Sequence, residues 1–229
     1  MDRKNFLKNG LLGLGSIIAI PTVISSCSKD ADDSSKPGSC TVSPTETKGP
    51  FPILTPTQLV RASIIGNRTG IALLITLTIQ DKSNSCTPLA GVLVDIWHCD
   101  KDGNYSQYGG TPMQTTNYTS ETFLRGRQTT DSNGKVSFIS IFPDWYSGRA
   151  PHIHLEVLTS NGISLLVSQI AFPKNICDTV YATSGYKGTA NQLNETDNVF
   201  SDSLSLNMAD SLTGNVTDGY TLLKTITVS

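Results

Sequence analysis

Short apolar runs that end at turn signals constrain the fold of this chain more than any other feature. The runs are rich in Val, Ile, Leu and Thr and span residues 71–79, 92–97, 135–141, 153–158, 164–172 and 220–228. Turn sequences lie between them, namely Asp102-Gly103-Asn104, Asn133-Gly134 and Asn161-Gly162. Asn-Gly between alternating apolar runs is the strongest short-range signal for a β-hairpin. Strands of this length and spacing predict an all-β sandwich or barrel.

Length and charge limit the remaining possibilities. A chain of 229 residues is long enough for one domain with extensions. The net charge of −2 provides no basic stripe, so we expect no nucleic-acid partner. Residues 175–218 are rich in Asn, Asp and Ser, and we expect long loops with one short helix there.

The N-terminus is typical of an export signal. Basic residues precede an apolar stretch at 11–24, which is too short and too interrupted by Gly and Pro for a membrane span. Small residues then precede Cys27, a pattern that resembles a bacterial lipobox; an ordinary signal peptide cut nearby is the alternative. We therefore expect an export signal at 1–27, a flexible tether at 28–43 and a folded domain at 44–229. The protein would be lipid-anchored through Cys27 on the periplasmic or cell-surface side of a bacterial membrane, with no other membrane contact.

Four cysteines remain once Cys27 is set aside: Cys40, Cys86, Cys99 and Cys177. Four cysteines allow three pairings, and the sequence does not choose among them. Export makes disulfides plausible. The pairing we expect is Cys40–Cys86, which would pin the start of the domain to a strand end.

Two of the three histidines, His152 and His154, are two residues apart on a predicted strand. Residues i and i+2 of a strand face the same side, so both imidazoles could bind one metal ion. The alternative is a pair of partly buried structural histidines. The preceding segment, 142–151, contains Trp145, Tyr146 and Arg149, and loops of this kind on a rigid scaffold often carry function.

Longer motifs surround these residues, namely Thr47-Lys48-Gly49-Pro50-Phe51, Pro88-Leu89-Ala90-Gly91-Val92-x-Val94-Asp95-Ile96-Trp97-His98-Cys99-Asp100-x2-Gly103-x-Tyr105-Ser106, Gly126-x3-Thr130-Asp131-x2-Gly134-x-Val136-x-Phe138, Pro143-x-Trp145-Tyr146-x-Gly148-Arg149-x-Pro151-His152-Ile153-His154, and Ser168-Gln169. Together they resemble the intradiol ring-cleavage dioxygenases over roughly residues 44–186. Lys48 replaces the usual Glu of the first motif, and Tyr146 lies only six residues before His152. This compact form resembles an exported branch of the family.

The resemblance implies a prealbumin-like antiparallel β-sandwich with long C-terminal loops. It also implies non-haem Fe(III) held by Tyr105, Tyr146, His152 and His154, which suits the preference of ferric ions for anionic oxygen ligands. The implied reaction uses O₂ to open a small catechol-type diol between its two hydroxyls. Tyr146 would be displaced by the substrate, Arg149 would stabilise negative charge on the ring, and Gln169 would orient the bound intermediate.

Other interpretations stay open from the sequence alone. Tyr108 is a rival to Tyr105 as ligand, whereas His98 is expected to be buried and structural. Residues 100–104 look like the start of a calcium loop but lack the downstream Glu of an EF-hand, so a turn is expected. A non-catalytic exported module that binds metal or ligand is the alternative function. The sequence predicts neither the particular catechol nor the oligomeric state.

Overall fold

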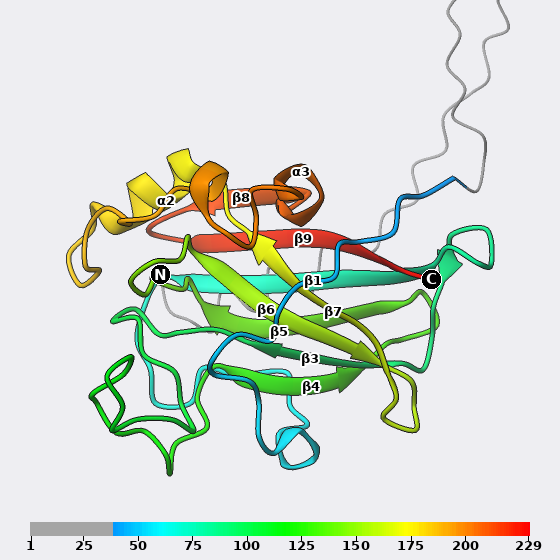
Figure 1. The fold of residues 1–229 in the computed structure, drawn as a ribbon, viewed down its shortest axis with the longest axis horizontal. Helices are drawn as coiled ribbons and strands as arrows, with labels where there is room; N and C mark the ends of the chain where they lie inside the picture. The colour runs from blue at the N-terminus through cyan, green and yellow to red at the C-terminus, as the bar shows by residue number, and fades with distance from the viewer. Residues whose placement is uncertain (1–38) are drawn as a thin grey trace, which may run out of the picture.

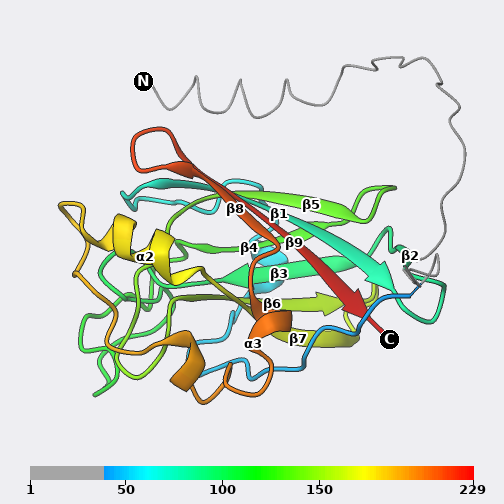
Figure 2. The same ribbon diagram turned by 90° about the horizontal axis from the view of Figure 1, so that it is seen from above.

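The computed structural model describes residues 39–229, so the predicted export signal and most of the predicted tether lie outside the described residues. Nine strands form two sheets, which Figure 2 shows as separate layers. The strands are β1 Ala72–Asp81, β2 Thr87–Pro88, β3 Leu93–Trp97, β4 Arg125–Thr129, β5 Lys135–Ile141, β6 His152–Leu158, β7 Ser164–Ala171, β8 Ser211–Asn215 and β9 Gly219–Val228. The helices are α2 Lys174–Tyr181 and α3 Leu204–Asn207, with 3₁₀ turns at Pro56–Gln58 and Asn194–Thr196.

One sheet has the strand order β4-β3-β6-β7. In the other sheet β1 lies between β5 and β9, β8 pairs with β9, and the two-residue strand β2 pairs with the end of β1. All pairs are antiparallel except β1 with β9, which is parallel. The predicted β-sandwich is confirmed, although the sheet that contains β1 is mixed.

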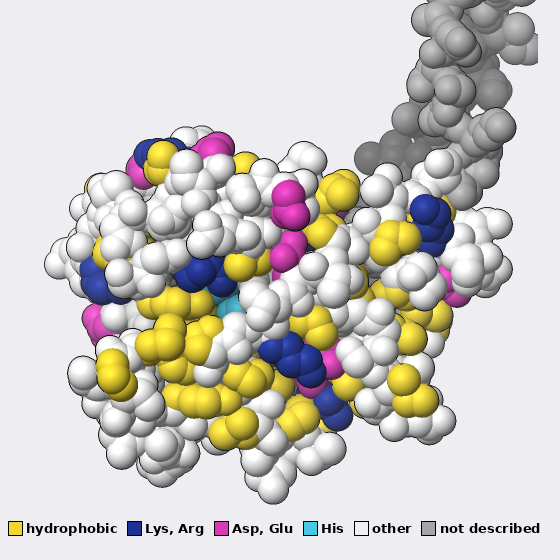
Figure 3. Space-filling view, in the orientation of Figure 1, with side chains coloured by type: hydrophobic (Ala, Val, Ile, Leu, Met, Phe, Trp, Pro, Cys, Tyr) yellow, Lys and Arg dark blue, Asp and Glu magenta, His cyan; other side chains and the backbone are white. Residues whose placement is uncertain are grey.

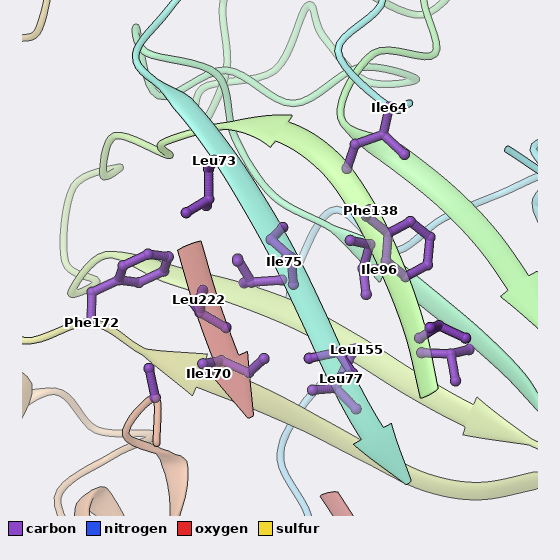
Figure 4. Close-up of a cluster of buried hydrophobic side chains, with 14 of the residues drawn as sticks. Ile64, Leu73, Ile75, Leu77, Ile96, Phe138, Leu155, Ile170, Phe172 and Leu222 are labelled. Atoms are coloured by element: carbon purple, nitrogen blue, oxygen red, sulfur yellow. The ribbon is translucent and has the colours of Figure 1, made fainter. Parts of the chain in front are cut away.

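The core fills the space between the sheets. Along β1, Leu73, Ile75 and Leu77 are fully buried while the residues between them are partly exposed. Leu155 of β6 and Ile170 of β7 approach from the other sheet (Figure 4). This period-2 alternation is the pattern that the sequence displays, and it fixes which face of each strand turns inward.

A strap formed by residues 43–64 crosses the outer face of the β4-β3-β6-β7 sheet (Figure 1). Its Glu46 amide donates to the Val167 carbonyl on edge strand β7, and Val60 forms a parallel bridge to Arg127 on the opposite edge strand β4. The strap therefore covers both edges of the sheet. Because of this cover, every residue of β6 is buried, including those that point away from the core.

Two sequence-based expectations were wrong in part. Asn161-Gly162 does join the antiparallel pair β6 and β7, but Asn133-Gly134 joins β4 to β5, which lie in different sheets. The turn chemistry is local, whereas the choice of pairing partner depends on the tertiary fold. The segment 175–218, expected as loops with one short helix, contains most of α2, a second short helix, α3, and the strand β8, whose five residues bury only Leu212. Pairing with β9 stabilises this strand, and no apolar alternation reveals it.

The predicted disulfide is confirmed. Cys40 and Cys86 are joined, with Cα atoms 6.0 Å apart, and Cys99 and Cys177 are buried free thiols. The Ser43 amide donates to the Thr227 carbonyl, so contacts with the sandwich begin inside the segment predicted as a tether. Between residues 39 and 229 no helix is long and apolar enough to cross a bilayer.

Candidate metal centre

The four predicted ligands come together on the outer face of the β4-β3-β6-β7 sheet, beneath the strap. His152 and His154 alternate with core residues of β6, and their Nε2 atoms lie 3.1 Å apart. The Tyr105 hydroxyl, from the loop after β3, lies 3.4 Å from His152 Nε2. The Tyr146 ring has its centroid 5.5 Å from that of His152 and 5.8 Å from that of Tyr105.

Hydrogen bonding fixes the tautomer of His152. Its Nδ1 lies 2.6 Å from the Ala150 carbonyl oxygen, which can only accept, so Nδ1 carries the proton and Nε2 presents a lone pair. Burial lowers the pKa of His152 to about 3. Burial also lowers the pKa of His154 well below its ordinary value, and the neighbouring His152 imidazole lowers it further. Both rings are therefore neutral at physiological pH, the form in which histidine binds metal ions.

The orientation of His154 is set by packing on two sides. The indole of Trp97, its cross-strand neighbour on β3, stacks on the imidazole with centroids 5.0 Å apart and planes within 3°. On the strap, Gly49 has φ of +68°, and a Cβ there would lie 2.9 Å from the His154 Cε1. Only glycine therefore lets the strap approach the imidazole this closely, which explains its place between Thr47 and Phe51.

Tyr105 is fully buried and stacks on Phe51 of the strap, with ring centroids 4.8 Å apart. Its backbone amide donates to Gln114 Oε1 at 2.6 Å, which anchors the loop. Burial raises the pKa of Tyr105 well above its ordinary value, so the phenol needs a nearby cation to ionise. The rival Tyr108 donates its hydroxyl to the Pro52 carbonyl at 2.8 Å and so helps to hold the strap.

Arg149 and Gln169 form a chain of polar contacts beside the cluster. Arg149 Nη2 donates to Gln169 Oε1 at 2.7 Å, and Gln169 Nε2 donates to the Thr47 carbonyl of the strap at 2.8 Å. The Arg149 Nε also lies 2.9 Å from a carboxylate oxygen of Asp197. Burial raises the pKa of Tyr146, and the neighbouring Arg149 opposes that rise.

Asp197 is the site residue that sequence reasoning missed. Its fully buried carboxylate accepts from the Arg149 side chain and from the Ala150 amide, at 2.7 Å. It therefore holds the loop that precedes His152. Asp197 lies in the segment rich in Asn, Asp and Ser, where no local pattern distinguishes it from its neighbours.

Two other expectations agree with the structure. His98 is fully buried, with Nε2 2.7 Å from Ser140 Oγ and Nδ1 2.8 Å from the Cys99 carbonyl oxygen, and burial lowers its pKa to about 4. The Asp100 carboxylate accepts from the amides of Asp102 and Asn104, which makes this segment a turn.

Among residues 39–229 no group of three or more His, Cys, Asp and Glu side chains is placed to hold a metal ion. A metal bound at this cluster would therefore need tyrosine oxygens besides the two imidazoles. The residues fit a ferric ion, because two neutral imidazole nitrogens and a phenol oxygen already converge and a second phenol lies beside them.

Comparison with known proteins identifies the chain as a dioxygenase by family. A family model described as Dioxygenase matches residues 54–209, about two thirds of the chain. An intradiol ring-cleavage dioxygenase from Tetranychus urticae is 29% identical, with a TM-score of 0.73 over 83% of this chain and 95% of that one. The chain belongs to the intradiol ring-cleavage dioxygenase family.

Two chlorocatechol dioxygenases are also similar to this chain, one in structure and one in sequence. The structure of 3-chlorocatechol 1,2-dioxygenase from Rhodococcus opacus 1CP is 20% identical, with a TM-score of 0.57 over 81% of this chain and 72% of that one. A chlorocatechol 1,2-dioxygenase of Rhodococcus opacus is 32% identical over 152 residues, 55% of this chain. The match spans about half (54%) of that relative's length.

Proposed function

We propose that this protein is a non-haem Fe(III) dioxygenase that uses O₂ to cleave a catechol-type ring between its two hydroxyls. One observation carries the proposal: His152 Nε2 lies within 3.4 Å of both His154 Nε2 and the Tyr105 hydroxyl, at a site flanked by Tyr146, Arg149 and Gln169. Metal storage alone would not require the last two residues.

Tyr105, Tyr146, His152 and His154 would hold the ion. Burial disfavours ionisation of both phenols, so a bound trivalent cation is what would make them anionic ligands. A bound ferric ion supplies the Lewis acidity that ionises the diol and activates its ring toward O₂. The reaction adds both oxygen atoms of O₂ to the diol and gives a ring-opened dicarboxylic acid, so no external reductant is needed.

The two tyrosines differ in burial, and this difference suggests separate roles. Tyr105 is fully buried and stacked, whereas Tyr146 is partly exposed on the loop before His152. Tyr146 is therefore the phenol that an entering diol can displace, and its oxygen can accept a hydroxyl proton of the diol. Arg149 lies beside it and supplies positive charge near the ring as negative charge develops there.

The test is oxygen incorporation by the purified, iron-loaded full chain supplied with catechol and ¹⁸O₂. We expect a ring-opened dicarboxylate with one labelled oxygen in each carboxyl group. His152→Gln should abolish iron binding and turnover, whereas His98→Gln, which alters a buried histidine bonded to Ser140 and Cys99, should retain both. If the protein binds iron but forms no product, the proposed dioxygenase activity is wrong and the alternative, a non-catalytic binding module, is favoured.

We also propose that the protein is exported and anchored by lipid at Cys27, with the residues between Cys27 and the disulfide-bonded Cys40 as the tether to the domain. The Cys40–Cys86 disulfide supports an oxidising compartment. Cys27→Ser should release the protein from membranes into the soluble fraction. Retention of the variant in membranes would contradict the lipid anchor.

A further inference from the structure

Arg125, the first residue of β4, is a fully buried cation without an acidic partner. Burial lowers its pKa to about 10, so the guanidinium stays charged at neutral pH. None of the ion pairs among residues 39–229 includes it. Arg127, two residues along the same strand, is also buried but donates to both carboxylate oxygens of Asp95, which is the usual arrangement. Because a buried charge without a counter-ion is costly, the contacts that Arg125 does make indicate its role.

The donors of Arg125 reach two segments that surround Tyr105. Its Nη1 donates to the Phe51 carbonyl of the strap at 2.9 Å, and its Nη2 donates to the Ser106 carbonyl at 2.6 Å. Its Nε also lies 3.0 Å from Ser106 Oγ. Phe51 stacks on the Tyr105 ring, and Ser106 is the next residue after Tyr105. The planar guanidinium therefore connects β4 both to the strap and to the loop that carries a predicted iron ligand.

Arg125 is also linked to the histidine side of the metal centre. In the β3–β4 pair its backbone lies opposite Trp97, whose indole stacks on the His154 imidazole. Phe51, Trp97 and Tyr105 belong to one buried cluster, and hydrophobic groups lie next to the visible histidine on this face of the molecule (Figure 3). In apolar surroundings a hydrogen bond from a charged donor is strong, and a carbonyl that loses its donor is left unsatisfied. Loss of the Arg125 contacts should therefore loosen the cluster around the ligands.

We propose that Arg125 is a positioning residue for the metal centre, which holds Tyr105 in place as an iron ligand by fixing the Tyr105 loop and the strap to β4. The inference rests on the proposed function and adds a residue that acts on the iron site through Tyr105. Lysine would keep the charge of Arg125, but its ammonium is a point charge without the planar fork that matches two carbonyls. The arrangement therefore requires the shape of the guanidinium besides its charge.

The experiment compares Arg125→Lys with the wild type in three measurements on the full chain. In a chelator competition the variant should bind iron at least about tenfold more weakly, since replacing a residue that orients a metal ligand typically costs about 10–100-fold in affinity. The visible charge-transfer band expected of tyrosinate bound to ferric iron should be weaker per bound iron, because Tyr105 is no longer held in the ligand position. Urea unfolding of the iron-free chain measures the loss of stability separately.

The matched control is Arg127→Lys. Residues 125 and 127 lie on the same face of β4, and each variant loses a buried arginine fork, so both should lower the free energy of unfolding. The Arg127 side chain donates to Asp95 and not to the strap or the Tyr105 loop, so its replacement should leave iron affinity and the band unchanged.

A second, milder variant is Ser106→Ala. It removes the hydroxyl that accepts from Arg125 Nε but keeps the Phe51 and Ser106 carbonyls as acceptors. Loss of one such hydrogen bond should lower iron affinity about threefold. This variant decides the question if Arg125→Lys does not fold, because unchanged iron affinity and an unchanged band in Ser106→Ala would then overturn the inference.

The remaining outcomes separate the inference from the proposed function. Wild-type iron affinity and a wild-type band in Arg125→Lys would overturn the positioning role while the proposed function stands. Equal losses of iron affinity in Arg125→Lys and Arg127→Lys would overturn it as well, because the effect would then follow from lower stability alone. If the ferric-loaded wild type shows no charge-transfer band, the proposed function itself fails.

Discussion

Replacing Asp197 by Asn tests whether this buried carboxylate organises the site. The substitution preserves side-chain shape but removes the charge that partners Arg149, whose side chain is only 12% exposed. Removing one partner of a buried ion pair leaves an uncompensated charge and typically costs 3–5 kcal/mol. Asn retains one oxygen that can accept from the Ala150 amide, so we expect a loss of about 3 kcal/mol, at the lower end of that range.

For a domain of this size the loss corresponds to a decrease in Tm of roughly 6–12 °C. Arg149 would also lose the contact that fixes its orientation toward Gln169, so kcat/KM should fall up to about 100-fold. Urea unfolding of the iron-free chain and steady-state turnover of the iron-loaded chain measure the two effects separately.

The matched control is Asp178→Asn. Asp178 also pairs with a cation, Lys174, but both side chains are about half exposed on α2. An exposed pair of this spacing is worth less than about 0.5 kcal/mol, and turnover should not change. If the Asp197 and Asp178 variants lose equal stability and both keep full activity, the structural role assigned to Asp197 is refuted.

Three further predictions concern the disulfide, a buried histidine and the strap. The disulfide Cys40–Cys86 closes a loop with a sequence separation of 46. Replacing both cysteines by Ser should lower the free energy of unfolding, measured in urea, by about 4 kcal/mol. A loss below about 1 kcal/mol would contradict the stabilising role of the disulfide. Burial lowers the pKa of His98 from 6.5 to about 4. Between these two pH values the unfolded state binds a proton that the folded state does not. The free energy of unfolding should therefore decrease by about 3 kcal/mol as pH falls from 6.5 to 4. His98→Gln should flatten this dependence in the iron-loaded chain, and an unchanged slope would refute the assignment. Gly49→Ala places a Cβ 2.9 Å from the His154 imidazole, a predicted iron ligand, and should lower iron affinity at least about tenfold in a chelator competition. Gly162 has a similar φ and open space around it, so Gly162→Ala should leave iron affinity unchanged. Equal iron affinities of the two variants would contradict the packing argument.

The sequence predicts those parts of the fold that depend on local alternation. β5 begins and ends at the expected residues, and β6 differs by one, because core and outward residues alternate along both. The same alternation places His152 and His154 on one face. The motif resemblance supplied the two tyrosines, which lie on loops where no periodicity could indicate their proximity to the histidines.

Long-range pairing accounts for what the sequence does not predict. β8 has almost no apolar pattern and depends on β9. Asp197 reaches Arg149 across 48 residues of chain, and only the folded structure brings the two together. The position of the strap also depends on long-range pairing. Its bridges to β4 and β5 are formed by backbone groups, so the side-chain sequence does not indicate them.

The most direct test of the central claim is the visible absorption spectrum of the ferric-loaded full chain, with and without catechol. Tyrosinate bound to ferric iron should give an intense charge-transfer band in the wild type that shifts when catechol is added. Tyr105→Phe should weaken this band. A colourless protein after ferric loading, or a band unchanged in the Tyr105 variant, would contradict the assignment of this cluster as the iron site.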